Sequence, residues 1–343
     1  MYRADFPPLS HRRQQDGKAR PAPLYDQHGR PIRYLRLAIT DRCNLRCRYC
    51  MPEQGIMPVS HDQTLSYEEM TRLVKLLLPL GIDKVRITGG EPFARRDCLN
   101  FLRSLKELGV PGLYLTTNGV ETWRYLDDLR RLGLSGLNLS LDSLDRRRFA
   151  AITRRDRLAE ALNTFSGALA AGIPLKINTV ALPDTSDEEM RELAGLARDH
   201  AITVRFIEPM PFSGANGQLA ANSETLTARL ARLFPETARA MPGGVAEVFS
   251  PPGFIGKIGY IAGHSRTFCE RCDKIRITAM GMLKNCLYDN GVLDLRRLLR
   301  DGASDGEIVA AIRAAIGQRH LDGHLTEMRC ARSQQPSMAT LGG

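Results

Sequence analysis

Residues 34–50 read YLRLAITDRCNLRCRYC, and the pattern that begins here decides the fold. The apolar run at 34–39 predicts a buried β-strand. The polar loop after it carries Cys43, Cys47 and Cys50. Three thiolates are one too few for a closed tetrahedral zinc site or for a fully ligated iron–sulfur cube. The deficit indicates a four-iron cluster with one open iron, at which a small molecule can bind and react.

Downstream of this loop, short β-like runs alternate with amphipathic stretches of helical length. Strands are predicted at 34–39, 84–88, 113–117, 137–141, 175–181 and 203–207. Helices are predicted at 67–80, 98–108, 122–132, 158–171 and 187–200. Such alternation is typical of βαβ units and a parallel sheet. The fold class is therefore α/β, and six units favour a partial (β/α)6 barrel of the TIM type over a complete one.

Polar motifs follow the predicted strands, where barrel-type sheets carry their chemistry. They are the cysteine loop, Gly89-Gly90-Glu91-Pro92, Thr116-Thr117-Asn118, Ser140 with Asp142, and Glu208. Two adjacent glycines let the backbone approach a ligand closely, and Glu91 offers an acceptor for an ammonium group. A bound α-amino acid would need both. The shared position of these motifs at the ends of predicted strands is stronger evidence for a common site than any single motif.

The regular alternation of strand-like and helix-like segments ends at about residue 245. Beyond it, short predicted strands surround a second cysteine triad, Cys269, Cys272 and Cys286. Strands are expected at 245–250, 257–262, 276–278 and 282–287, and helices at 294–300 and 305–320. We therefore divide the chain into a flexible tail (1–30), a partial barrel (31–244), a C-terminal module with a second iron–sulfur cluster (245–330) and a tail (331–343) that ends in Gly342-Gly343.

Composition narrows the functional classes. The 343 residues carry a formal charge of +10, which indicates an anionic partner. Six of the eight cysteines fall into the two triads, which favours metal in a reducing compartment over disulfides. Cys98 and Cys330 have no ligand-spaced partner and are predicted to be inert thiols. We find neither a signal-peptide core nor an apolar run of membrane-span length, so a cytoplasmic protein is expected.

Zinc is the alternative to iron at each triad. His61 would supply the fourth ligand of the first site, and His264 that of the second. With a charge of +10, the chain would then be a zinc-stabilised nucleic-acid-binding protein. That interpretation leaves Gly89-Gly90-Glu91-Pro92 and the polar strand ends unexplained.

The first triad and Gly89-Gly90-Glu91-Pro92 resemble the radical S-adenosylmethionine (SAM) enzymes. In that family SAM chelates the open iron, and an electron from the cluster cleaves it to methionine and a 5′-deoxyadenosyl radical. The resemblance implies SAM contacts from Tyr49, Gly89, Gly90, Glu91, Ser140 and Met210.

Both triads together make the resemblance more specific. Further segments of this chain also match the same family: 34–37, 40–43, 85–93, 116–119, 138–142, 205–208 and the final Gly342-Gly343. From about residue 26 onward the chain is similar to the GTP 3′,8-cyclase family. The resemblance implies two [4Fe-4S] clusters and SAM as cofactors. It also implies conversion of GTP to (8S)-3′,8-cyclo-7,8-dihydroguanosine 5′-triphosphate, the first step of molybdenum cofactor biosynthesis. The implied partners are a flavodoxin- or ferredoxin-type electron donor, cyclic pyranopterin monophosphate synthase and a second copy of the chain, with neither nucleic acid nor membrane.

The same resemblance places the guanine at the second cluster and basic residues around the triphosphate. The implied GTP-binding residues are Arg36, Lys84, Arg86, Thr117, Lys176, Arg205, Lys274, Ile275 and Arg276, and the Gly342-Gly343 tail is expected to reach the active site. Independently, five of these cations lie on predicted strands, where a core-facing cation is costly unless it meets a polyphosphate. The alternative is that they lie on outward faces beside acidic helix residues.

Two adjacent positions depart from the family pattern. Lys274 stands where the family usually has arginine, and Asp273 beside it replaces the commoner asparagine. A lysine keeps the charge but loses the planar fork of a guanidinium. The sequence also leaves open a radical SAM enzyme that modifies a peptide and carries an auxiliary cluster, although strand cations argue against a peptide.

Overall fold

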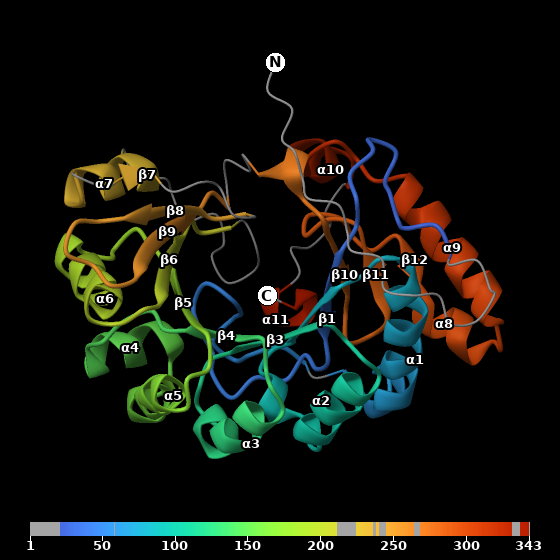
Figure 1. The fold of residues 1–343 in the computed structure, drawn as a ribbon, viewed down its shortest axis with the longest axis horizontal. Helices are drawn as coiled ribbons and strands as arrows, with labels where there is room; N and C mark the ends of the chain where they lie inside the picture. The colour runs from blue at the N-terminus through green and yellow to red at the C-terminus, as the bar shows by residue number, and fades with distance from the viewer. Residues whose placement is uncertain are drawn as a thin grey trace, which may run out of the picture.

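The computed structural model describes residues 21–57, 59–210, 224–235, 238–239, 245–263, 268–330 and 337–342. Helices surround an inward-facing sheet that curves around a central space (Figure 1). In the described residues the helices are α1 (Tyr67–Leu77), α2 (Cys98–Glu107), α3 (Leu126–Arg131), α4 (Arg146–Thr153), α5 (Leu158–Ala170), α6 (Asp187–Asp199), α7 (Leu226–Leu233), α8 (Leu295–Arg300), α9 (Asp305–Gly317), α10 (Gly323–Arg329) and α11 (Met338–Leu341).

One sheet contains every strand of the described residues, in the order β12-β11-β10-β1-β2-β3-β4-β5-β6-β9-β8-β7. The strands are β1 (Tyr34–Ala38), β2 (Lys84–Thr88), β3 (Gly112–Thr117), β4 (Gly136–Ser140), β5 (Leu175–Val180), β6 (Thr203–Ile207), β7 (Ala238–Arg239), β8 (Glu247–Ser250), β9 (Lys257–Ile261), β10 (Lys274–Ile277), β11 (Met282–Lys284) and β12 (Leu293–Asp294). β1 to β6 run parallel in chain order. The predicted α/β partial barrel is confirmed.

The sequence pattern explains why the barrel helices form and pack. Ser66 caps α1 in a reciprocal capping box with Glu69, as the sequence predicts. Met70, Leu73 and Val74 of α1 are fully buried in the core between helices and sheet. Burial of such side chains, at about 1.5–3 kcal/mol each, holds the helix against the sheet. No helix of the described residues is both long and apolar enough to cross a bilayer.

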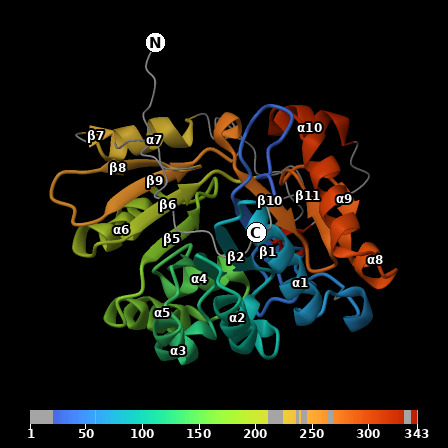
Figure 2. The same ribbon diagram turned by 45° about the vertical axis from the view of Figure 1, so that its right-hand side comes forward.

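The predicted C-terminal module shares the sheet of the barrel. β10 pairs in parallel with β1, and β9 pairs in parallel with β6, so 245–330 extends both edges of the six-stranded sheet. Figure 2 shows β9 and β10 on opposite sides of the central strands. Strand pairing between these distant segments leaves no signal in the spacing of the sequence. The consequence is that the second triad is fixed by the barrel itself.

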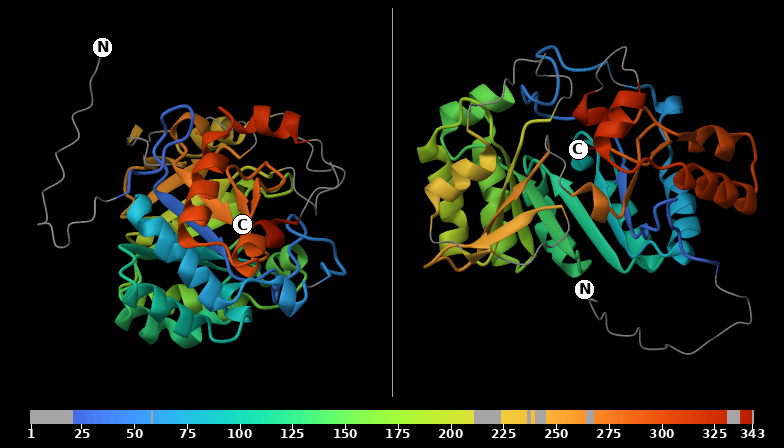
Figure 3. Two further views of the ribbon diagram at one scale, coloured as in Figure 1. Left: turned by 90° about the vertical axis from the view of Figure 1, so that its right-hand side faces the viewer. Right: turned by 90° about the horizontal axis from the view of Figure 1, so that it is seen from above.

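Parts of both predicted tails pack on the domain. Residues 1–20 and 331–336 lie outside the described residues, but 21–30 pack on the domain, with Leu24 only 1% exposed. Residues 337–342 carry α11, which lies at the centre of the barrel (Figures 1 and 3). Ala339 and Leu341 of this helix are buried, which explains why a four-residue helix is stable there.

Candidate active site

A cavity of about 460 Å³ lies inside the barrel and is lined by all six triad cysteines. The first triad follows the C-terminal end of β1. Because β10 runs parallel to β1, Cys272 before β10 lies at the opposite end of the barrel. Cys286 lies there too, because it follows the antiparallel β11. The two triads therefore occupy opposite ends of one space.

The loop of the first triad is held by the elements beside it. Arg46 donates to the carbonyl of Cys43 (2.6 Å), and Ser337 of the C-terminal segment donates to the carbonyl of Cys50 (2.8 Å). Burial raises the pKa of Cys43 to about 11 and that of Cys50 to about 12, and it raises the pKa of Cys47 as well. Thiols in this environment ionise at neutral pH only when a cation binds them, as cluster iron does.

Gly89 and Gly90 allow the loop after β2 to lie against the first cysteine loop. A Cβ on Gly89 would stand 2.5 Å from the carbonyl oxygen of Thr40, and one on Gly90 would stand 2.3 Å from that of Arg42. Both glycines line the cavity. Close backbone packing therefore requires glycine at these two positions, while their other side faces the space where SAM is expected.

The structure corrects the role expected for Glu91. Its carboxylate is fully buried and does not line the cavity. It accepts hydrogen bonds from the Thr117 hydroxyl (2.8 Å) and the Asn118 backbone N–H (2.7 Å). Burial raises the pKa of Glu91 to about 7. Glu91 thus joins the ends of β2 and β3 and positions the glycine loop, instead of facing an ammonium group directly.

The remaining SAM candidates line the cavity. Tyr49, Ser140 and Met210 are all among the lining residues. The Tyr49 hydroxyl donates to Asp142 (2.8 Å), whose other oxygen accepts from the Val180 N–H. Burial raises the pKa of Asp142 to about 6. Asp142 therefore orients Tyr49 in the cavity wall, a role that its position after β4 does not reveal.

Both triads fit a cubane better than a single ion. Among the described residues, no group of three or more His, Cys, Asp or Glu side chains is close enough to hold one metal ion. A cubane attaches its cysteines to separate irons, so its ligands stand farther apart. His61 is exposed, in the short 3-10 helix His61–Gln63, and His264 lies outside the described residues. The described residues thus contain no preformed single-ion site of the kind that the zinc alternative requires.

Within the second triad, Cys272 lies beside cations. Burial alone would raise the pKa of Cys272, but the charges of Arg319 and Lys274 outweigh it and lower that pKa. Burial raises the pKa of Cys286. The backbone N–H of Cys286 donates to Asp289 (2.8 Å), which fixes this ligand after β11.

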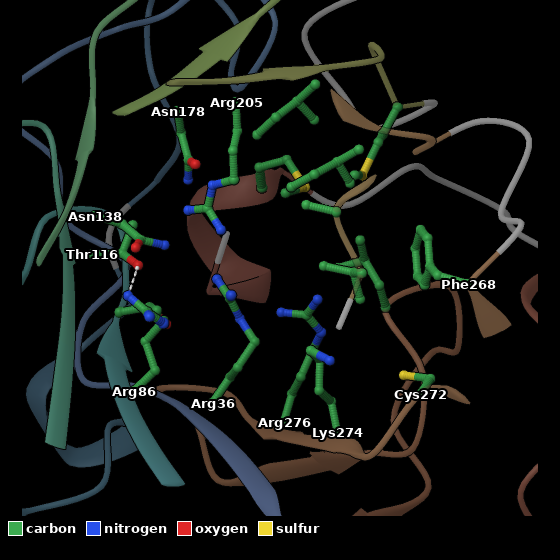
Figure 4. Close-up of a pocket in the computed structure, with 18 of the residues that line it drawn as sticks. Arg36, Arg86, Thr116, Asn138, Asn178, Arg205, Phe268, Cys272, Lys274 and Arg276 are labelled. Atoms are coloured by element: carbon green, nitrogen blue, oxygen red, sulfur yellow. Dashed lines mark hydrogen bonds between the residues drawn. The ribbon is translucent and has the colours of Figure 1, made fainter. Parts of the chain in front are cut away.

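Three arginines form a row across adjacent strands. Arg36 of β1 is in register with Arg276 of β10 on one side and with Arg86 of β2 on the other. Figure 4 shows these side chains pointing into the same space as Arg205 and Lys274. Burial and then the charge of Arg276 lower the pKa of Arg36 to about 9. The row costs free energy in the absence of an anion, because like charges share one buried space.

Arg205 and Asn178 face this row from the other side of the cavity and are in register on β6 and β5. The Arg205 Nε and Nη2 atoms and the Asn178 Oδ1 atom are buried without a hydrogen-bond partner in the described residues. Burial and then Arg86 lower the pKa of Arg205 to about 10. A ligand with both anionic and hydrogen-bonding groups would satisfy these atoms. The alternative that the strand cations face outward is wrong for this part of the barrel.

The substrate candidates of β10 divide into two groups. Lys274 and Arg276 line the cavity, whereas Ile275 between them is fully buried in the hydrophobic core. Alternation along the strand explains the division, because successive side chains point to opposite faces. The expected contact of Ile275 is therefore wrong for its side chain. Lys274 donates to Asp273 (2.8 Å), so part of its charge is already neutralised.

Tyr34 is a cavity residue that the sequence analysis missed. Its hydroxyl accepts from Arg86 Nε (2.6 Å), and the Lys84 ammonium lies 4.5 Å from its ring centroid. Burial raises its pKa, but Arg86, Arg36 and Lys84 together lower it to about 7. Asn138 and Asn178 were missed as well, although their two-residue spacing from Ser140 and Lys176 places each pair on one strand face.

The C-terminal segment reaches the row of arginines. The Gly342 carbonyl accepts from Arg276 (3.3 Å) and from Arg36 (3.4 Å). Gly342 has φ 74°, and a Cβ there would lie 2.7 Å from that of Ala38, so glycine is required. Gly343 lies outside the described residues.

Two family models match the chain in succession. The radical SAM superfamily matches residues 37–197, and Molybdenum Cofactor Synthesis C matches residues 202–325. The fold resembles SuiB of Streptococcus suis in its SAM-bound crystal structure, with a TM-score of 0.60, 17% identity and coverage of 81% of this chain and 68% of that one. The chain is thus a radical SAM enzyme in family and fold, and the cofactors of this class are SAM and [4Fe-4S] clusters.

Sequence relatives identify the family. The GTP 3′,8-cyclase of Moorella thermoacetica is 36% identical over 93% of this chain and 100% of its own length. That of Pelotomaculum thermopropionicum is 38% identical, also over 93% of this chain and 100% of its own. The molybdenum cofactor biosynthesis protein 1 of Dictyostelium discoideum is 35% identical over 93% of this chain and 52% of its own. The chain belongs to the GTP 3′,8-cyclase family.

Proposed function

We propose that this enzyme converts GTP to (8S)-3′,8-cyclo-7,8-dihydroguanosine 5′-triphosphate, in the first step of molybdenum cofactor biosynthesis. The observation that carries the proposal is the row of Arg276, Arg36 and Arg86 between two cysteine triads in one cavity. Among the described residues, Arg86, Arg205 and Arg276 form no ion pair with a carboxylate. Their charges are available to a triphosphate.

We assign a distinct task to each group of side chains. Cys43, Cys47 and Cys50 hold the first cluster, and Cys269, Cys272 and Cys286 hold the second. Tyr49, Gly90, Ser140 and Met210 form the SAM pocket. When bound, the first cluster and SAM supply the radical chemistry that removes hydrogen from ribose C3′ and lets that carbon bond to guanine C8. The protein orients GTP and shields the reacting groups from water.

The cationic groups hold the triphosphate so that the ribose faces the SAM end. They are Arg36, Lys84, Arg86, Lys176, Arg205, Lys274 and Arg276, and all line the cavity. Thr117 donates to Glu91 and supports the wall beside them. Planar guanidinium groups suit phosphate oxygens because they donate two parallel hydrogen bonds.

The direct test is an anaerobic incubation of the reconstituted protein with SAM, GTP and dithionite. Formation of 5′-deoxyadenosine together with a cyclised nucleotide supports the proposal. Formation of 5′-deoxyadenosine with GTP unchanged would keep the radical SAM chemistry and refute the substrate. ATP in place of GTP is the control, and no cyclised product is expected from it.

Arg205→Gln is expected to lower kcat/KM for GTP by about 10- to 100-fold, the loss expected for one or two charge-assisted hydrogen bonds. Arg191→Gln removes the same charge from an exposed side chain of α6 and serves as the control. Steady-state assays of both variants check the prediction. Equal kinetics in the two variants would show that Arg205 does not meet the substrate.

Lys176 makes GTP binding depend on pH. Burial and then Arg205, Lys84 and Arg86 lower the pKa of Lys176 to about 8. Below that pH the ammonium is present and binds the triphosphate. Above it, the neutral amine must take up a proton on binding, so affinity falls by up to about tenfold per pH unit.

Lys176→Arg removes this titration, since a guanidinium stays charged throughout the range. Calorimetric titration with GTP from about pH 7 to about pH 9.5 checks the prediction. Wild type should weaken above about pH 8 by more than Lys176→Arg does. Parallel curves for the two proteins would contradict the role of Lys176. Both proteins contain Tyr34, so any effect of its ionisation on GTP affinity is common to the two curves and cancels when they are compared.

We further propose, on the family resemblance, a flavodoxin- or ferredoxin-type electron donor, because SAM cleavage consumes one electron. The product would pass to cyclic pyranopterin monophosphate synthase. A homodimer in the cytoplasm completes the proposal. Sedimentation of the reconstituted protein measures the oligomeric state, and a monomer at micromolar concentration would refute the dimer.

A further inference from the structure

Residues 24–32 form a hairpin beside the second triad. Leu24 and Ile32 are joined by a backbone hydrogen bond (2.9 Å), and Tyr25 and Pro31 form a β-bridge. The hairpin carries Asp26 and Arg30, whose side chains are 0% and 9% exposed and form an ion pair at 2.6 Å. An ion pair buried this deeply is costly unless its hydrogen-bonding capacity is satisfied.

Arg30 satisfies that capacity by binding three backbone carbonyls. Its guanidinium donates to Cys269 (2.9 Å), to His320 (2.8 Å) and to Leu321. One side chain therefore connects the hairpin, the loop of the second triad and the segment between α9 and α10. Arg30 also lines the cavity.

Arg319 makes the matching contact on the next cysteine. Its guanidinium donates to the Cys272 carbonyl (2.9 Å) and stands 3.7 Å from the Asp26 carboxylate. The Arg319 side chain is only 5% exposed. Gln27 and His28 of the hairpin in turn contact the Arg319 carbonyl at 2.7 and 3.1 Å. Arg30, Arg319 and Asp26, named here the arginine clamp, thus hold two of the three ligand residues.

The arginine clamp carries a net positive charge. Two guanidinium groups share a single carboxylate, and both line the cavity together with Cys269 and Cys272. Arg276 adds further positive charge on β10, whereas Lys274 beside it is paired with Asp273. The carboxylates of Asp142 and Glu91, by contrast, lie close enough to interact with Cys47 and Cys43 of the first triad. Asp289 also interacts with Cys286, and Arg46 with Cys43, so each triad has neighbours of both signs. At Cys272, however, the neighbouring charges of Arg319 and Lys274 are positive.

An iron–sulfur cluster gains one negative charge on reduction, and its potential depends on nearby charge and hydrogen bonds. We infer that the arginine clamp positions the second cluster and that the charge of Arg319 raises its reduction potential. The inference deepens the proposed function because it concerns the cluster of the same site. Its readout uses neither GTP nor turnover, so it can fail or succeed independently of the substrate.

The experiment is an anaerobic redox titration of the full-length protein with both clusters reconstituted, followed by electron paramagnetic resonance. The signal absent from Cys272→Ala is assigned to the second cluster. In Arg319→Gln, with about eight irons retained, the reduction equilibrium constant of that cluster is expected to fall about tenfold, which corresponds to about 59 mV. The potential of the first cluster should not change. An unchanged second potential in Arg319→Gln would overturn the inference.

Two further variants separate charge from packing. Arg319→Lys keeps the charge, and we expect its second potential to lie within about threefold of the wild-type equilibrium constant. Arg297→Gln removes a charge from an exposed α8 side chain and should change neither cluster. If Arg319→Gln loses the second cluster's iron, Arg319→Lys decides the question. If Arg319→Lys then retains about eight irons and a wild-type potential of the second cluster, the role of the charge is supported. Loss of the second cluster's iron in both variants would refute it.

Discussion

Replacement of Cys43 by alanine is expected to reduce 5′-deoxyadenosine formation to the level of a protein-free mixture. Cys43 is one of three cysteines on the loop after β1, and Asn118 and Arg46 contact it at the thiol (3.6 Å) and the carbonyl (2.6 Å). With two cysteines left, the cubane loses a ligand that no neighbour can replace. Iron should fall from about eight to about four per chain.

Cys98→Ala is the matched control for this variant. Cys98 is buried in α2 at 2% exposure, and its thiol does not line the cavity. Its loss should cost about 1 kcal/mol of stability while iron content and SAM cleavage remain at wild-type values. SAM cleavage at a wild-type rate in Cys43→Ala would contradict the assignment of the first cluster.

Replacement of Cys272 by alanine is expected to abolish the cyclised nucleotide while some 5′-deoxyadenosine still forms. The reason is the separation of the two triads at opposite ends of the barrel, which leaves the first cluster and SAM pocket intact. Without the second cluster, GTP loses one of its anchors, and the radical chemistry becomes uncoupled from product. Chromatography of both products in one reaction mixture measures the two outcomes.

Cys330→Ala controls for loss of a C-terminal thiol, because Cys330 follows α10 and does not line the cavity. It should give normal yields of both products. A normal yield of cyclised nucleotide from Cys272→Ala would refute the role of the second triad.

Local patterns predicted the barrel well, because βαβ units are specified by contacts within a few dozen residues. The strand at 84–88 and the capping box of α1 follow directly from local sequence. β9 and β10 were identified as strands, but their pairing with β6 and β1 was not predicted. Such pairing depends on contacts between residues more than fifty positions apart, which leave no periodic signal.

In the site, too, some residues were predictable from local sequence and others were not. The cysteines and the cations on the strands were identified because they interrupt apolar runs or share a ligand spacing. Arg30 and Arg319 were missed, since a lone arginine in a polar segment usually indicates a solvated surface. Glu91 was expected to accept from an ammonium group because it follows two glycines, and Ile275 was assigned to GTP by family position. Only the direction of their side chains revealed a buried carboxylate and a core residue.

We propose that one cavity brings the SAM-derived radical to the ribose of GTP. The most direct measurement is the mass of 5′-deoxyadenosine formed from SAM and GTP deuterated at C3′, under anaerobic conditions with dithionite. We expect the deoxyadenosine to gain one deuterium in the reaction that yields cyclised nucleotide. Unlabelled deoxyadenosine formed alongside the cyclised product would contradict it.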